Sequence, residues 1–96
     1  MTTQSNPSEH DLHRAEIDHE LSVAITAELR GAPSEELRRA VSSYVADAKR
    51  TLAPPQDVIA SLKTHMQRDA QPHMGAEDYP RLVAQVVAWG IEDYYR

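Results

Sequence analysis

The sequence predicts an all-α protein, a small bundle of four helices in a single domain. Proline and glycine are concentrated in four short stretches, SNPS, GAPS, APP and QPHMGAEDYP, which separate four longer segments. None of these segments shows the strict polar–apolar alternation of a half-buried strand. A chain of 96 residues also has room for only one hydrophobic core. We therefore expect one helical domain over residues 7–96.

Start and stop signals delimit the first helix. Asn6 is a good N-cap and Pro7 fits the first helical position, while Gly31 is the usual left-handed terminator. We therefore expect a helix over residues 7–30, preceded by a disordered N-terminus over residues 1–6. This helix is expected to be the loosest of the four, because its apolar residues form only a modest stripe. The stripe consists of Ile17, Leu21, Ala24 and Ile25, with Leu12 and Val23 on the opposite side.

The other three helices are expected over residues 33–51, 55–70 and 79–95. At about 100° per residue, the second helix has one apolar stripe that extends to Leu52, and the third has a narrower one. The fourth is the most apolar, with an arc of roughly 200°. Gly90 lies at the middle of that arc, where the missing Cβ lets another backbone approach closely. We therefore expect the fourth helix to be the centre of the fold.

The composition excludes several classes of function. A net charge of −5 and an isoelectric point near 5.4 oppose non-specific attraction to nucleic acid and to anionic membranes. The absence of cysteine excludes disulfides and thiol catalysis. No apolar run reaches the ~20 residues that span a bilayer, and the start of the chain lacks the features of a secretory signal. We expect a cytoplasmic protein that binds no membrane.

No catalytic signature is present. The chain has no serine elbow, no dinucleotide-binding fingerprint, no Gly-rich phosphate loop and no convergent pair of carboxylates. Aromatic residues near the C-terminus could line a ligand cleft, but such residues at helical spacing are more typical of an interface. We therefore expect a non-enzymatic, regulatory or adaptor-like protein that uses no cofactor and works by binding other proteins.

A homodimer is the specific interaction that the sequence predicts. The chain has one tryptophan and no phenylalanine, so its core is thin, and small chains with thin cores often gain burial by oligomerising. The fourth helix also has more apolar surface than one neighbour covers. The predicted interface residues are Leu82, Val86, Trp89, Gly90, Tyr94 and Tyr95.

The stretch HDLHRAEIDHE, residues 10–20, raises the question of a metal site. His10 and His19 lie about 180° apart on a helix, so the three histidines of this stretch cannot bind one ion. His13, Glu16 and Glu20 share a face and form an incomplete ligand set. Glu16 and His19 also match the Glu-x-x-His motif of di-iron bundles, although one chain lacks the second copy that such a site needs and only a symmetric dimer could supply it. The alternative is a solvated polar face.

A second hypothesis concerns His19 alone. The stretch HELSVAI, which begins at His19, resembles the phospho-accepting box of sensor histidine kinases. Glu20, Leu21 and Ile25 match that box, whereas Ala24 stands where proline is usual. The resemblance implies a phosphotransfer bundle in which His19 accepts a phosphoryl group. It implies no kinase, because the chain has no room for an ATP-binding domain. The alternative is an ordinary exposed histidine.

The middle of the chain also permits a helix-turn-helix reading. Residues 33–51 and 55–70 flank a short turn, and Lys63, Gln67 and Arg68 are expected on the exposed face of the second of these helices. Three such side chains are few for a recognition helix, and the negative charge of the chain opposes DNA binding. A helical hairpin that closes the bundle is the preferred interpretation.

Overall fold

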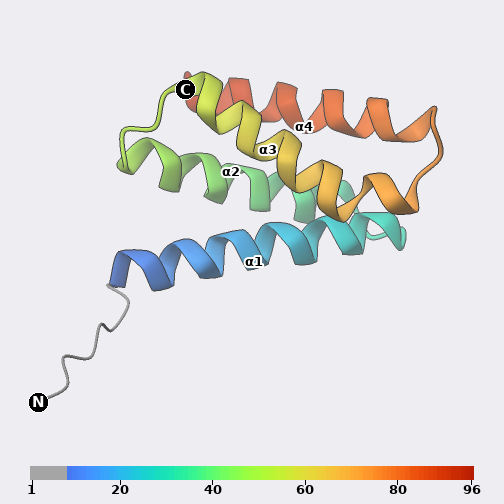
Figure 1. The fold of residues 1–96 in the computed structure, drawn as a ribbon, viewed down its shortest axis with the longest axis horizontal. Helices are drawn as coiled ribbons and strands as arrows, with labels where there is room; N and C mark the ends of the chain where they lie inside the picture. Colours follow the sequence, from blue (N-terminus) through green and yellow to red (C-terminus); the bar gives the residue numbers. More distant parts are fainter. Residues whose placement is uncertain (1–8) are drawn as a thin grey trace, which may run out of the picture.

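The computed structural model describes residues 9–96, and this part of the chain is helical without any strand (Figure 1). The predicted all-α bundle of four helices is confirmed. A short 3-10 turn, η1, precedes the last helix. The elements are α1 (Glu9–Leu29), α2 (Ser34–Arg50), α3 (Pro55–Asp69), η1 (Gln71–His73) and α4 (Asp78–Tyr94).

The predicted helix boundaries agree with the observed ones within two residues wherever the structure describes them. The expected helix start at Pro7 and the disordered stretch 1–6 lie outside the described residues. Gly31 terminates α1 as predicted, with a φ of 93° that only glycine adopts readily. The backbone N–H of Ala32 donates to the carbonyl of Ala27 at 3.0 Å, which closes the terminal turn.

The four helices surround one core, and α2 contributes the most buried residues to it. Figure 1 shows α2 between α1 and α4, and α1 and α4 each contact both α2 and α3. The expectation that the fourth helix is central is therefore wrong: only Val86 and Gly90 of α4 are buried. The buried residues of α2 are Leu37, Val41, Tyr44, Val45, Asp47 and Ala48.

The modest apolar stripe of α1 is buried as predicted. Its inner side chains pack against α2 and α3, whereas Leu12 and Val23 on the opposite side are 53% and 52% exposed. Burial of this stripe provides the hydrophobic stabilisation of α1 in the bundle. The buried members are Ile17, Leu21, Ala24 and Ile25.

Gly90 packs closely against α3, but the neighbour is a side chain and not a backbone. A Cβ at Gly90 would lie 2.6 Å from Leu62 Cδ1 and 3.4 Å from Ile59 Cδ1. Leu62 is fully buried. The leucine therefore occupies the space that a larger residue would need, which explains a glycine in the middle of a helix despite its cost of ~1 kcal/mol.

Leu52 does not extend the apolar stripe of α2. The helix ends at Arg50, and Leu52 adopts a left-handed backbone with a φ of 61°. The N–H of Ala53 donates to the carbonyl of Ala48 at 3.1 Å, the bond that defines a Schellman terminus. This conformation directs Leu52 into solvent, where its exposed fraction is 88%.

Candidate functional site

The outward side of α4 carries a second apolar face, distinct from its buried one. Ile91 and Tyr95 are 47% and 70% exposed, Ala84 and Ala88 are also exposed, and Val87 is half-buried. At about 100° per residue, these side chains fall within an arc of about 100° that points away from the core. The name "outer stripe" is used here for these five residues: Ala84, Val87, Ala88, Ile91 and Tyr95.

The predicted interface residues do not form one surface. Val86 and Gly90 are buried in the core of the chain, so the prediction that they contact a second copy is wrong. Leu82 and Trp89 are half-buried against the core. The remaining two, Tyr94 and Tyr95, lie at the C-terminal end of the helix, where one is half-buried and the other exposed.

Tyr94 and Tyr95 have different environments at the C-terminal end of α4. The hydroxyl of Tyr94 donates to the carbonyl of Ala53 at 2.7 Å, so this half-buried ring ties α4 to the turn before α3. The ring of Tyr95 lies edge-on to that of Tyr94, with a centroid distance of 5.2 Å, and remains exposed. Among the six predicted interface residues, Tyr95 alone is on the outer stripe. The sequence signal for a second apolar face on α4 was the width of its apolar arc, roughly 200°.

A charged cluster between α2 and α4 orients α4 so that the outer stripe faces solvent. The Arg38 guanidinium donates to Asp93 Oδ1 at 2.9 Å and to Glu92 Oε1 at 3.0 Å, and it lies over the Trp89 ring at 5.7 Å. Ser42 also donates to Asp93, at 2.8 Å. The hydrogen bonds from Arg38 and Ser42 lower the pKa of Asp93, although partial burial opposes them. These bonds fix the rotation of α4 about its axis.

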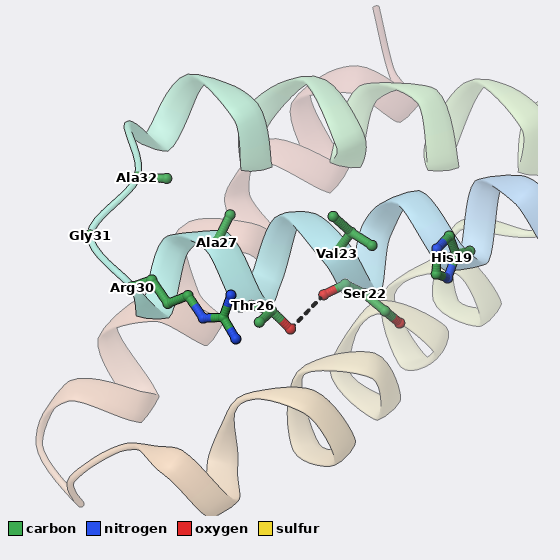
Figure 2. Close-up of a pocket in the computed structure, with 8 residues that line it drawn as sticks. All are labelled: His19, Ser22, Val23, Thr26, Ala27, Arg30, Gly31 and Ala32. Carbon is green, nitrogen blue, oxygen red and sulfur yellow. Dashed lines mark hydrogen bonds between the residues drawn. The ribbon is translucent and has the colours of Figure 1, made fainter.

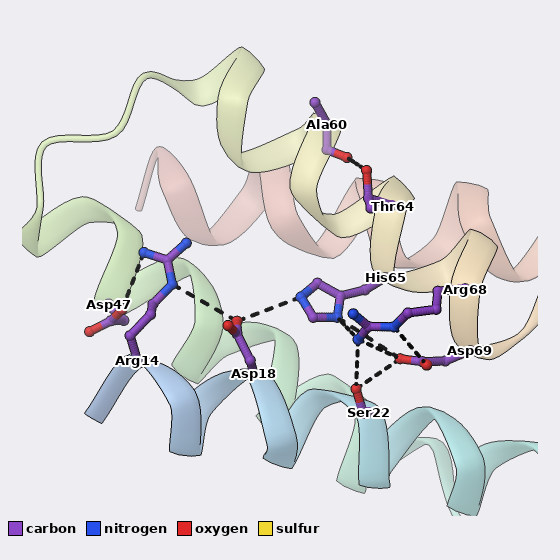
Figure 3. A network of polar contacts seen from close by, with 9 residues as sticks. All are labelled: Arg14, Asp18, Ser22, Asp47, Ala60, Thr64, His65, Arg68 and Asp69. Atoms are coloured by element: carbon purple, nitrogen blue, oxygen red, sulfur yellow. Dashed lines mark hydrogen bonds and ion pairs between the residues drawn. The ribbon is translucent and has the colours of Figure 1, made fainter. Parts of the chain in front are cut away.

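A second polar cluster joins α1 to α2 and α3, and Figure 3 shows its members. The name "polar seam" is used here for Arg14, Asp18 and Ser22 of α1, Asp47 of α2, and His65, Arg68 and Asp69 of α3. The three residues of α1 recur every four positions, so they form a row on one side of that helix. This spacing was the sequence signal for the seam, but the signal alone does not reveal their partners.

Ser22 forms the tightest link between α1 and α3. Its hydroxyl donates to Asp69 Oδ2 at 2.8 Å and accepts a hydrogen bond from Arg68 Nη2 at 3.1 Å. Arg68 also donates to both oxygens of Asp69, at 3.1 and 3.2 Å. The hydrogen bonds from Arg68 lower the pKa of Asp69 and those to Asp69 raise the pKa of Arg68, so both groups are charged at neutral pH.

Asp47 is a buried carboxylate at the other end of the seam. It is 2% exposed, and Oδ2 has no hydrogen-bond partner among the described residues. Three basic groups surround it: Arg50 at 3.3 Å, His13 at 3.6 Å and Arg14 at 3.7 Å. The charges of the two arginines compensate part of the cost of burying a carboxylate.

The weak metal-site hypothesis for His13, Glu16 and Glu20 is not supported by the arrangement of these side chains. His13 Nε2 contacts Arg50 Nη2 at 2.9 Å and so faces a cation. Glu16 and Glu20 are exposed. Within residues 9–96, no three or more histidine or acidic side chains gather in a way that could hold a metal ion. The side chain of His10 is outside the described part.

His19 is exposed, as a phospho-acceptor would have to be. It lies at one end of an open groove of about 730 Å³, whose other end is the turn at Arg30 and Gly31 (Figure 2). A second groove, between α1 and α2, also includes His19 and reaches Arg39. Val23, one turn after His19, lines both grooves. The imidazole therefore stands on an accessible surface with an exposed apolar side chain beside it.

The helix-turn-helix alternative loses one of its three candidate contacts. Lys63 and Gln67 are exposed on α3, but Arg68 is bonded to Asp69 and to Ser22 of α1. An arginine held in this way is not available to a phosphate backbone unless those bonds break. The geometry therefore does not favour the DNA-binding interpretation. It does not support the preferred hairpin either, because α2 and α3 pack mainly on α1 and α4 and not on each other.

No protein-family model, curated protein or solved structure matches this chain. Among the helices of residues 9–96, none has both the length and the apolar character needed to cross a bilayer.

Proposed function

We propose that this protein is a small, non-enzymatic interaction module of the regulatory or adaptor kind, which forms a homodimer through the outer stripe of α4. The observation that carries this proposal is the exposure of Ile91 and Tyr95 on a helix whose opposite face already fills the core. An apolar row of this kind is costly in water unless another surface covers it.

A second copy of the chain is the partner that fits this surface. The outer stripe has its small residues, Ala84 and Ala88, in the N-terminal part and its two large ones, Ile91 and Tyr95, in the C-terminal part. When two α4 helices pair antiparallel about a two-fold axis, Ile91 of each copy packs over Ala84 of the other. The same symmetry brings Arg81 to the flank of the stripe where Glu92 of the other copy lies, so opposite charges meet at both ends.

The homodimer is tested by the mass of the protein in solution. Sedimentation equilibrium up to several hundred micromolar is expected to give a dimer for the wild type and a monomer for Ile91→Glu. Leu12→Glu is the matched control: Leu12 is 53% exposed and lies on α1, so this variant is expected to remain dimeric. Circular dichroism checks that both variants keep their helices. A monomeric wild type over the whole range contradicts the proposal.

The orientation of the two helices is tested separately. Arg81→Glu is expected to weaken the dimer, because it places like charges opposite each other in the antiparallel arrangement. The effect is expected to diminish at high salt, since exposed charges are screened. A dimer that is unaffected by Arg81→Glu but broken by Ile91→Glu contradicts the antiparallel arrangement and leaves the use of the outer stripe intact.

Histidine phosphotransfer is the second candidate function, and the exposure of His19 between two grooves favours it. A phosphotransfer partner needs an accessible imidazole and an adjoining surface on which to dock. The test is incubation with small-molecule phosphodonors, followed by measurement of acid-labile phosphate. His19→Ala is expected to abolish the label, whereas His73→Ala, which removes another exposed histidine, is expected to retain it. Label that survives His19→Ala, or no label with any donor, contradicts this function.

A further inference from the structure

Among the histidines whose burial the structure describes, only His65 is buried. It lies on α3 where this helix meets α1 and α2. Its side chain is 10% exposed. Asp18 of α1 is 3.5 Å from Nε2, and the ring of Tyr44 of α2 lies edge-on with a centroid distance of 5.3 Å. From α3 itself, Arg68 and Asp69 face Nδ1 at 3.0 and 3.9 Å (Figure 3).

The contact with Arg68 determines the protonation state of this histidine. A guanidinium has only donors, so Nδ1 of His65 must accept a hydrogen bond from Arg68 Nη2 and carries no proton. The single proton of the neutral ring is then on Nε2, which faces Asp18. The same Nη2 atom of Arg68 donates to Ser22 of α1. Neutral His65 thus helps to hold the arginine that joins α3 to α1.

We propose that protonation of His65 releases α1 from α3, so that mild acid opens one side of the bundle while α2, α3 and α4 stay together. A second proton, taken from solvent, binds to Nδ1 and places two donors and two positive charges face to face. Arg68 must then move away and its bond to Ser22 is lost, so that Ser22 keeps only its hydrogen bond to Asp69 as a polar link to α3. The released side of the bundle is the surface that the stripe of α1 covers.

Opposing charges are present but do not reverse the direction of this effect. Asp18 and Asp69 favour a charged imidazole, while burial and Arg68 disfavour it more strongly and lower the pKa of His65 below its usual value. A lowered pKa means that docking is fully stable above pH ~6.5, the usual value for histidine. Docking weakens as pH falls below that value, until the lowered pKa is reached.

Contacts elsewhere in the fold determine which helices separate. α1 packs much more extensively on α2 than on α3, so the interface that opens is the one between α1 and α3. α4 is held to α2 by Arg38 and Asp93, a pair without histidine. The other histidine that bridges from α1 is His13, which is exposed and contacts Asp47 at 3.6 Å and Arg50 at 2.9 Å. Both partners belong to α2, so His13 does not join α1 to α3.

The release of α1 is tested by distances between spin labels. The chain has no cysteine, so exposed positions can be labelled in pairs: Ala15→Cys with Gln67→Cys for α1 to α3, and Ala46→Cys with Gln67→Cys for α2 to α3. Between pH 7.5 and 5.0, the first pair is expected to gain a long-distance population. As pH falls, this population is expected to rise by up to about tenfold per pH unit, because the opening of α1 is coupled to the binding of one proton. The second pair is expected to stay unchanged.

Variants assign the effect to one histidine. His65→Gln keeps an acceptor for Arg68 and cannot be protonated, so it is expected to abolish the pH response, whereas His13→Gln is expected to retain it. Should His65→Gln fail to fold, NMR titration of the wild-type imidazoles replaces it: the midpoint of His65 is expected below 6.5 and to coincide with the opening of α1. Unchanged α1–α3 distances at pH 5.0, a response that survives His65→Gln, or joint opening of both label pairs overturns the proposal.

Discussion

Replacing Leu52 by glycine is expected to stabilise the protein. Leu52 has a φ of 61°, where a side chain crowds the following carbonyl at a cost of roughly 1–2 kcal/mol. Glycine avoids that cost but loses roughly 0.5–1 kcal/mol more backbone entropy on folding than other residues. The leucine side chain is 88% exposed, so its removal forfeits little burial. The net gain is roughly 0.5–1 kcal/mol.

Thermal unfolding is a suitable assay for a change of this size. In a domain of 60–100 residues, 1 kcal/mol shifts the melting temperature by roughly 4–8 °C, so Leu52→Gly is expected to raise it by roughly 2–8 °C. Urea titration is expected to show a higher midpoint with an unchanged slope, since the same surface is exposed on unfolding. Both measurements belong at neutral pH, where α1 is docked.

Leu52→Ala separates backbone strain from side-chain exposure. Alanine removes most of the leucine side chain but keeps the Cβ that crowds the carbonyl, so its stability is expected to equal that of the wild type within ~0.5 kcal/mol. If alanine stabilises as much as glycine, the gain comes from removing an exposed hydrophobic group, and the argument from backbone strain is refuted. A glycine variant that melts below the wild type refutes it as well.

Two further predictions concern α4. Gly90→Ala is expected to destabilise the protein by up to ~2 kcal/mol in urea titrations, because overpacking against buried Leu62 costs roughly 1–3 kcal/mol and alanine regains only ~1 kcal/mol of helix propensity. In a Leu62→Ala background the same change is expected to stabilise instead, and equal effects in both backgrounds argue against this contact. Asp93→Asn is expected to flatten the acid side of the stability–pH curve. The lowered pKa of Asp93 stabilises the fold above the usual value near 3.8, and that stabilisation is lost as pH falls toward the lowered pKa. A variant as acid-sensitive as the wild type contradicts this role.

The helices themselves followed from local sequence. Gly31 and the prolines mark the boundaries because their backbone preferences act within a few residues. The stripe of α1 and most of that of α2 also follow from helical periodicity, which determines the side chains that share a face. Periodicity did not predict the exposure of Leu52. Its position depends on where α2 ends, and a terminus can shift by one residue without a strong local signal.

The sequence by itself determined that this protein is a bundle of four helices and which apolar residues of α1 point inward. The tertiary structure decided which half of the broad apolar arc of α4 is buried, because periodicity gives the width of a face but not the number of neighbours that cover it. It also decided the partners of His65 and Asp47. These contacts join helices distant in the chain, and a polar side chain at a given helical spacing looks the same whether its partner is water or another helix.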